Sequence, residues 1–276
     1  MKKILATVIA VLGLTAILSS CKNEVLTDYY FEENSAYSVG GGEELSENVS
    51  KIDIGWISGK VAVKTDKTVD KIVFSEEYNG DDEYKMRYII ENGVLKIRYA
   101  KNGADIKQEI AEKKNLTVLV PDGKLLTELE TETVSASCFI DGINATKMDL
   151  SSVSGRMESR NCTVGKGGYE CETVSGAIVF DGEINGTADL SSVSGNAEIS
   201  LENALENMDC KTVSGNVKIS LSSDTKGFKV DFETTSGEFA CNKEFSKNKN
   251  IFTYGDESTY IDAESVSGGI SIEIKD

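Results

Sequence analysis

The sequence repeats one short pattern seven times in its second half. "LSSVSGNAEIS" at 190–200 and "CKTVSGNVKIS" at 210–220 are nearly identical, and "LSSVSGRMES" at 150–159 and "CETVSGAIVF" at 171–180 follow the same pattern. A period of about 20 residues is typical of solenoids, in which each repeat contacts only its neighbours along one axis. The repeats must therefore stack, because one repeat alone cannot bury its own apolar side chains.

The middle serine of each V-S-G aligns the copies as an anchor. The anchors are Ser135, Ser154, Ser175, Ser194, Ser214, Ser236 and Ser267. Six and four residues before the anchor the side chains are almost all apolar, as at Met148 and Leu150. Between them, every copy carries an acid: Glu130, Asp149, Glu170, Asp189, Asp209, Asp231 and Asp262. This alternation predicts a strand with one buried face and one wet face.

The V-S-G itself predicts a corner between two strands. Valine precedes the anchor in six of the seven copies and glycine follows it in six, with Thr235 and Ala136 as the exceptions. We expect the valine, such as Val193, to point inward with Leu190 while Asp189 points outward. The chain must then bend, and glycine would supply the backbone freedom of that bend. Each repeat is thus predicted to comprise two strands, a corner and a variable return.

The sequence as a whole predicts an all-β chain, a single-chain β-solenoid or β-helix with an N-terminal β cap region. The chain has one proline, Pro121, and 25 glycines, a composition that favours short strands and tight turns. "IDIGWISGKVAV" at 52–63 fits an earlier rung with Ser58 as anchor. Four strands without the motif follow as the cap: "VDKIVF", "YKMRYII", "GVLKIRYA" and "NLTVLVPDG". The stretch "NKEFSKNKN" before Ser267 is expected to be a surface excursion.

Four segments are predicted along the chain. Residues 1–20 form a signal peptide, 21–49 a flexible acidic tether, 50–127 the N-terminal β region and 128–276 the repeat domain. The start "MKKILATVIAVLGLTAILSSC" combines two lysines with an apolar run, Ile4 to Leu18, that is too short for a comfortable membrane span. This pattern predicts export from the cytoplasm.

The end of this segment, Leu18-Ser19-Ser20-Cys21, resembles the lipobox of bacterial lipoproteins. In that family the chain is cut before the cysteine, which then carries lipid. The resemblance implies lipid attachment at Cys21 and a place in the cell envelope, on the outer face of the cytoplasmic membrane or on an outer membrane where two membranes exist. The alternative is a plain secretory signal with an incidental cysteine.

A wider resemblance covers roughly residues 50–276. The V-S-G rungs, "WISGKV" at 56–61, "NLTVLVPDG" at 115–123 and the ending "YGDESTYIDAESVSGGISIEI" together resemble an adhesin-like domain family of bacteria. The resemblance implies a β-solenoid. It brings no agreed catalytic or binding residues, because the function of that family is unknown.

Composition excludes several kinds of chemistry. The chain has no histidine, which removes Ser-His-Asp and Cys-His catalysis and the usual zinc sites. A net charge of −17 argues against a nucleic-acid partner. The cysteines that fall in inward columns, Cys138, Cys171, Cys210 and Cys241, are interpreted as small hydrophobic residues, with a disulfide left open. We expect no cofactor and no metal.

The acidic column is the candidate functional feature. Its carboxylates repeat in like surroundings, whereas acid–base catalysis needs carboxylates in unlike ones, so we expect no enzyme. The hypothesis is a lipid-anchored envelope protein that acts as an adhesin or binding module for an extracellular glycan or protein. Its candidate surface strip is Asp149, Glu170, Asp189, Asp209 and Asp231. The alternatives are a structural or regulatory scaffold, for which the strip is only a solvated face, and a polysaccharide-active β-helix enzyme.

Overall fold

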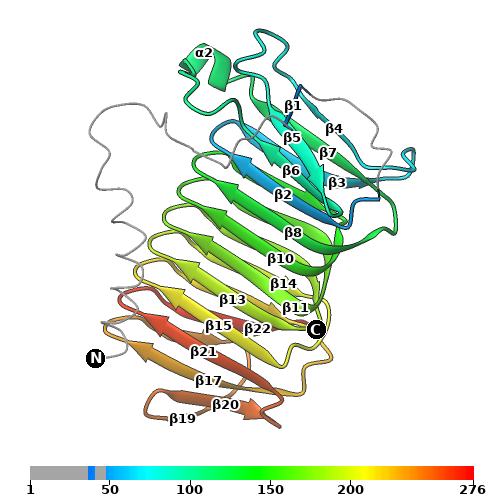
Figure 1. The fold of residues 1–276 in the computed structure, drawn as a ribbon. Coiled ribbons are helices and arrows are strands. Elements are labelled where there is room, and N and C mark those ends of the chain that lie inside the picture. The colour runs from blue at the N-terminus through cyan, green and yellow to red at the C-terminus, as the bar shows by residue number, and fades with distance from the viewer. Residues whose placement is uncertain (1–36, 41–47) are drawn as a thin grey trace.

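A computed structural model describes residues 37–40 and 48–276 as a long rod of stacked short strands (Figure 1). The first strands are β1 (Ser38–Val39), β2 (Lys51–Trp56), β3 (Lys60–Asp66), β4 (Val73–Glu76), β5 (Arg87–Glu91), β6 (Val94–Arg98), β7 (Asn115–Pro121), β8 (Leu125–Thr133), β9 (Ser137–Asp141), β10 (Asn144–Ser152) and β11 (Met157–Thr173). They are followed by β12 (Ile178–Ile184), β13 (Thr187–Ser192), β14 (Ala197–Leu201), β15 (Asn207–Thr212), β16 (Val217–Leu221), β17 (Gly227–Thr234), β18 (Phe239–Cys241), β19 (Ser246–Asn248), β20 (Ile251–Gly255), β21 (Thr259–Ser265) and β22 (Ile270–Ile274). The predicted all-β solenoid is confirmed.

The described helix α2 (Gln108–Ala111) is a single turn in the loop between β6 and β7. In the part of the chain that the structure describes, no helix is long and apolar enough to cross a membrane. The predicted signal peptide and Cys21 lie outside the described residues.

Two ladders of parallel strands form the long sides of the rod. One ladder runs β6, β2, β8, β10, the end of β11, β13, β15, β21 and β17. The other runs β7, β3, β9, the start of β11, β12, β14, β16, β22 and β18. Antiparallel strands close the ladders, with β5 on β6, β4 on β7 and β20 on β17.

The rungs do not follow sequence order at either end of the rod. The rung of β2 and β3 lies between the cap strands β6 and β7 and the later rung of β8 and β9. At the other end β21 and β22, the last rung of the chain, insert between the rungs of β15 and β16 and of β17 and β18. The expected surface excursion around "NKEFSKNKN" is instead the hairpin of β19 and β20, which covers β17.

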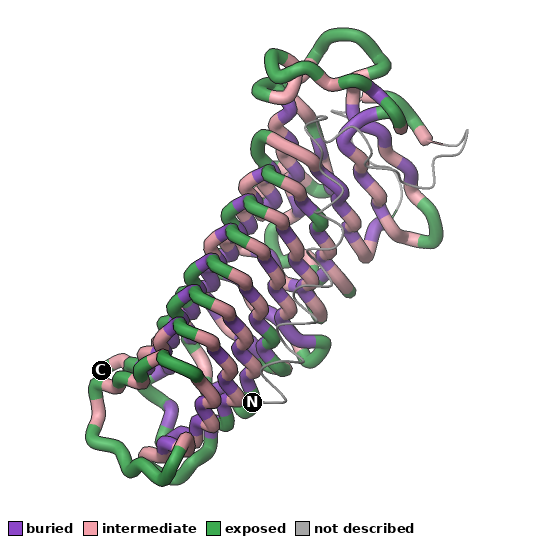
Figure 2. Tube along the Cα trace, turned by 90° about the vertical axis from the view of Figure 1, so that its left-hand side faces the viewer, coloured by how far each residue is buried: buried purple, intermediate pink, exposed green. Residues whose placement is uncertain are grey.

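The interior of the rod is filled by the predicted apolar columns (Figure 2). Met148 and Leu150 are fully buried, and Leu190 is 4% exposed while Asp189 is exposed. The inward orientation predicted for Val193 is wrong, because this residue is only half-buried. Ser192 is buried in its place, since the period-two alternation of the strand continues to that position.

The Ser or Thr two residues before the anchor holds the corner together in six of the seven rungs, and it is buried in five of these six. The Ser192 hydroxyl accepts the backbone N–H of Gly195 at 2.8 Å. Equivalent bonds join Ser152 to Gly155, Thr173 to Gly176, Thr212 to Gly215, Thr234 to Gly237 and Ser265 to Gly268. A backbone N–H is satisfied at each of these corners, and it is buried at all of them except Gly237, which is half-buried.

The corner glycines are required by close approach rather than by an unusual backbone angle. A Cβ on Gly195 would lie 1.8 Å from the carbonyl oxygen of Gly176 in the neighbouring rung. Equivalent contacts occur at Gly155, Gly176, Gly215, Gly237 and Gly268, and none of these glycines has φ in the left-handed region. The expected role of glycine as a source of backbone freedom is therefore corrected.

Candidate functional site

The acids of the repeat form one unbroken ladder on the outer face of the first stack. Direct backbone pairing joins Asp53 to Glu130, Glu130 to Asp149, Asp149 to Glu170, Glu170 to Asp189, Asp189 to Asp209, Asp209 to Asp262, and Asp262 to Asp231. We call these eight residues the acidic ladder. Neighbouring strands are about 4.8 Å apart, so like charges follow one another at that spacing. The five residues of the predicted strip all belong to it.

Three lysines on the same face neutralise part of this charge. Lys51 contacts Glu128 at 2.8 Å and Glu130 at 2.7 Å, and although partial burial opposes it, these bonds raise the Lys51 pKa. Lys147 contacts Asp149 at 2.7 Å and Glu170 at 3.4 Å. Its bond with Asp149 raises the pKa of Lys147.

Charge compensation differs between Asp209 and Asp189. Lys211 contacts Asp209 at 2.7 Å, whereas Asp189 accepts a hydrogen bond from the hydroxyl of Thr187 at 3.3 Å. Beside the ladder, burial and then the charges of Glu170 and Asp149 raise the pKa of Glu172. The net field of this face is negative.

The N-terminal end of the acidic ladder is closed by an arginine. The two terminal nitrogens of Arg98 donate to the two carboxylate oxygens of Asp53 at 2.7 and 2.8 Å. This bidentate geometry is the strong form of an arginine–carboxylate pair. Both carboxylate oxygens of Asp53 are therefore occupied by this structural pair, and the acids from Glu130 onward form the accessible part of the ladder.

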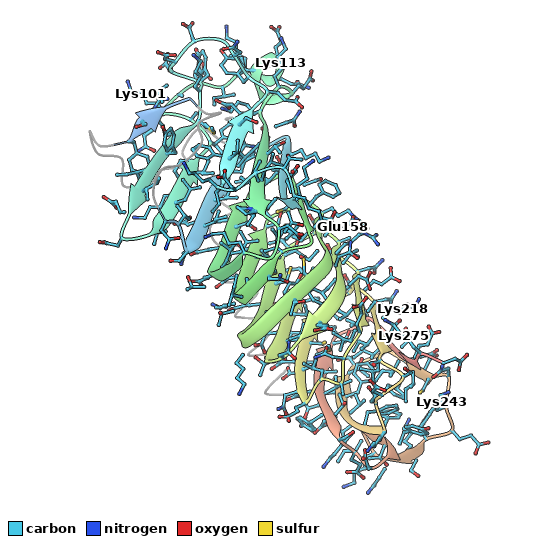
Figure 3. The ribbon with its side chains drawn as sticks, turned by 90° about the vertical axis from the view of Figure 1, so that its right-hand side faces the viewer. Lys101, Lys113, Glu158, Lys218, Lys243 and Lys275 are labelled. Atoms are coloured by element: carbon cyan, nitrogen blue, oxygen red, sulfur yellow. The ribbon has the colours of Figure 1, made fainter. Side chains whose placement is uncertain are left out.

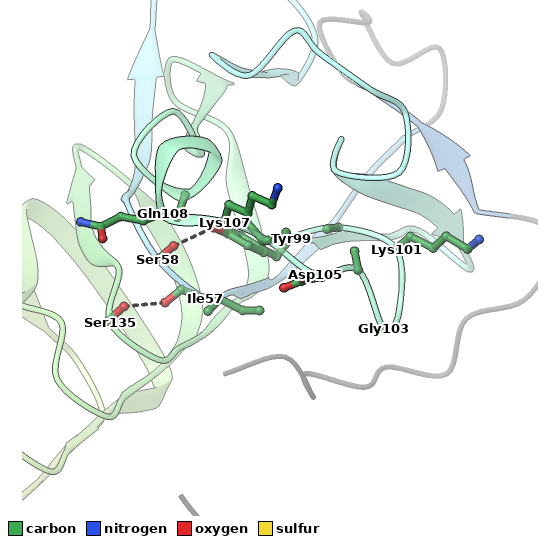
Figure 4. Close-up of a pocket in the computed structure, with 13 residues that line it drawn as sticks. Ile57, Ser58, Tyr99, Lys101, Gly103, Asp105, Lys107, Gln108 and Ser135 are labelled. Atoms are coloured by element: carbon green, nitrogen blue, oxygen red, sulfur yellow. Dashed lines mark hydrogen bonds between the residues drawn. The ribbon is translucent and has the colours of Figure 1, made fainter. Parts of the chain in front are cut away.

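A pocket of about 500 Å³ lies at the N-terminal end of the corner column (Figure 4). Ile57 and Ser58 line it from the corner of β2 and β3, and Tyr99 and Ile106 line it from the excursion that links β6 to β7. The Tyr99 hydroxyl lies 2.6 Å from Ser58 Oγ. In later rungs the anchor hydroxyl bonds to the preceding rung, as Ser154 does to the Val134 carbonyl, so Tyr99 takes the place of that rung here.

Behind Tyr99 lies the fully buried Lys114. Its ammonium contacts the buried Glu76 carboxylate, donates to the Tyr84 carbonyl at 2.6 Å, and lies 5.2 Å from the centre of the Trp56 ring. Burial lowers the pKa of Lys114 to about 8. Because both partners are enclosed, this pair fixes the cap rather than offering a reactive amine to the pocket.

The buried cysteines supply no reactive site in the described part of the chain. Cys138, Cys162, Cys171, Cys210 and Cys241 are free, and the first four are buried. Burial raises the pKa of Cys138 and of Cys171 to about 12, which keeps both as thiols at neutral pH. The described residues also contain no group of three or more metal-ligating side chains.

Sequence reasoning located the acidic ladder but not the pocket. The ladder repeats with the motif, so alignment of the rungs reveals it. The pocket depends on residues 99–111, which carry no repeat, and no pattern there predicts what they enclose. The lipid attachment predicted at Cys21 lies outside the described residues and stays a prediction.

Comparison with known proteins gives one family match. The model of the family described as Toastrack DUF4097 matches residues 58–273. A solved structure described as a "putative cell adhesion protein" from Clostridium sporogenes ATCC 15579 is similar at 15% identity, covering 87% of this chain and 99% of its own, with a TM-score of 0.36. No curated protein matches the chain.

Proposed function

The chain belongs to the Toastrack family, and from this premise we propose that it is a non-catalytic binding module of the cell envelope, anchored by lipid at Cys21. The family match confirms the resemblance to an adhesin-like domain family of unknown function. The proposed ligand is an extracellular glycan or protein, and the proposed contact surface is the strip of Asp149, Glu170, Asp189, Asp209 and Asp231.

The observation that carries this proposal is the register of the acidic ladder. Consecutive rungs present carboxylates at one regular spacing on a strand face, where the backbone rather than a mobile loop holds them. A partner with repeated cationic or hydrogen-bond-donor groups could engage many of them at once, which raises avidity without any strong single contact. Complementary charge also speeds association.

The absence of histidine and the likeness of the carboxylates to one another support a role without catalysis. General acid–base pairs need two groups whose surroundings separate their pKa values. Along the accessible ladder each acid from Glu130 to Asp262 instead sits between two other acids on neighbouring strands. The surface is better suited to binding than to proton transfer.

Two experiments test the proposal. The Cys21→Ser chain should leave the membrane fraction or stay unprocessed, and unchanged processing, fractionation and acyl labelling would place the anchor elsewhere.

On arrays of glycans and extracellular proteins, the Cys21→Ser chain should bind at least one ligand class. Asp149→Asn, Asp189→Asn and Asp209→Asn combined should abolish binding of at least one ligand class, whereas Glu202→Gln, off the ladder, should abolish none. If no ligand class loses its binding with the triple change, the strip is removed from the proposal.

A further inference from the structure

We propose that the C-terminal end of the rod carries a second binding site, separate from the acidic ladder, that takes an uncharged oligosaccharide. The site is a pocket of about 840 Å³ between the corner of the terminal rung and the hairpin of β19 and β20. This volume is within the range of small-ligand sites.

The pocket exists because the end of the rod is only half covered. The hairpin covers β17, whereas β18 pairs with β22 alone among the described strands. Phe239, at an inward position of the terminal rung, therefore stays partly exposed. Its ring stacks on Phe252 with the centres 4.1 Å apart.

Polar groups surround this aromatic pair. Glu238 extends from the corner, Lys247 and Lys249 come from the hairpin, and Asn250 follows them. The ammonium of Lys247 lies 5.0 Å from the centre of the Phe252 ring. Carboxylate, ammonium and amide groups beside the partly exposed Phe239 ring match a ligand with an apolar ring face and hydroxyls around its edge, which is the chemistry of a sugar.

The charges of the lining are balanced, unlike those of the chain. Glu233 and Glu238 face Lys247 and Lys249 in the pocket, whereas the net charge of the whole chain is −17. Within residues 37–40 and 48–276, none of these four side chains forms an ion pair. Their hydrogen-bonding groups are available to a ligand, and the balance of charge favours an uncharged one.

A second hollow extends the site along the neighbouring face. This groove of about 350 Å³ shares Glu238 with the pocket and is lined by Asn196, Asn216 and Lys218 over β14, β16 and β22. Figure 3 places Lys218 and Lys243 toward this end of the rod. Two adjoining hollows that share one carboxylate fit a chain of sugar units better than they fit a single sugar unit.

The site lies at the tip of the rod that is distant from the N-terminal cap. The entering strand β1 pairs with β5 in the N-terminal cap, and the hairpin of β19 and β20, which lines the pocket, lies at the opposite end of the rod (Figure 1). A chain held at its N-terminus would thus carry this pocket on its far end.

The test measures calorimetric binding of the full Cys21→Ser chain to hexasaccharides of glucose, mannose, xylose and N-acetylglucosamine. Hexagalacturonate serves as the charged counterpart. We expect at least one uncharged probe to bind, and Glu238→Gln and Lys249→Gln each to weaken it about tenfold or more. Glu132→Gln, at an exposed position, and Lys124→Gln, at a partly exposed one, are the matched controls far from the pocket and should bind as the parent does.

Several results would overturn the inference. These are no binding of any uncharged probe, tighter binding of hexagalacturonate, or equal effects of the site and control variants. Binding of an extended peptide with alternating apolar residues, lost with the same two variants, would assign the site to a protein partner instead. The ladder variant with three Asn substitutions should leave sugar affinity unchanged, so this site and the proposed strip can fail independently.

Discussion

Ser267 donates both its backbone N–H and its hydroxyl to the carbonyl of Val213, at 3.0 and 3.4 Å. The last corner of the chain therefore rests on a rung formed 54 residues earlier. Ser236 in turn bonds to Val266, so the terminal rung of the rod lies earlier in sequence than the rung beneath it. The C-terminus is held between two rungs, where it cannot fray as the end of a sequentially wound solenoid would.

This order predicts which cysteine pairs can be cross-linked. Cys210 is the direct register partner of Ala263, and Phe232 lies one rung further on. We expect Ala263→Cys to form a disulfide with Cys210 on mild oxidation, because facing residues on adjacent strands are within bridging distance. Non-reducing electrophoresis and peptide mapping would detect it.

Phe232→Cys is the matched control for the rung order. Two rungs separate it from Cys210, about 10 Å, which is beyond the reach of a disulfide. A cross-link from residue 232 and none from residue 263 would mean that the rungs follow sequence order after all.

The buried corner hydroxyls should matter for stability. Ser192→Ala removes the acceptor of the Gly195 N–H and leaves that group buried without a partner. We expect a loss of about 1–3 kcal/mol in the free energy of unfolding, measured by denaturant titration. Ser192→Thr should be close to neutral, because Thr173 and Thr212 form the same bond in the adjacent rungs. Equal effects of the two changes would show that the hydroxyl is not the cause.

The corner glycine should not tolerate even one added carbon. In Gly195→Ala the new Cβ would collide with the Gly176 carbonyl, a backbone atom fixed in the neighbouring rung. We expect a cost of at least about 3 kcal/mol or failure to fold, followed by circular dichroism and thermal unfolding.

Ala136→Gly is the reverse change at the equivalent position. In the stack, Ala136 lies next to the corner of the rung of β2 and β3, which turns at Gly59 with φ of +85°. The Ala136 side chain is fully buried there and its Cβ is accommodated. Its cost should stay near 1 kcal/mol. A similar cost for the two variants would contradict the close-approach explanation.

The sequence predicted the period-two columns of the strands but not the packing of the corners or the order of the rungs. The columns of Met148, Leu150 and Asp149 follow from period-two alternation, which each rung restates. The apolar side chain of Val193 suggests burial, but the period-two alternation assigns the buried position to Ser192 and leaves Val193 half-buried. The exchanged order of the Ser236 and Ser267 rungs leaves no mark in the sequence, since both carry the same motif and either could pair with β15.

The terminal pockets were unpredictable for a related reason. Tyr99 and Phe239 line them only because no further rung covers the corner column at each end of the rod. Which rung is terminal depends on long-range pairing. Each cap strand can be recognised from its own sequence, but the pocket that the cap leaves open cannot.

The buried thiols should make the protein sensitive to alkali. Burial raises the pKa of Cys138 from 9.0 to about 12, so above pH 9 the unfolded chain releases a proton that the folded chain retains. The stabilising contribution is complete below pH 9 and declines as pH rises toward 12, by about 1.4 kcal/mol per pH unit for each such thiol. Urea midpoints between pH 8 and 10 would show a smaller decline for Cys138→Val, and parallel slopes would contradict the assignment.

The acidic ladder should make stability depend on salt. Two carboxylates about 4.8 Å apart repel by up to about 0.9 kcal/mol in water, and salt reduces this because the screening length falls to about 10 Å at 0.1 M. Lys51, Lys147 and Lys211 offset part of the repulsion, and the segment around Asp189 has the least compensation. We therefore expect the thermal midpoint of the Cys21→Ser chain to rise from low to physiological sodium chloride. The rise should be smaller when Asp149, Asp189 and Asp209 are all changed to Asn, whereas Glu202→Gln should keep the parental response.

Millimolar calcium at constant ionic strength separates simple screening from cation binding, since only a ladder that binds the ion gains further stability from it. A midpoint independent of sodium chloride would mean that the charges of these acids do not act on one another across the rungs.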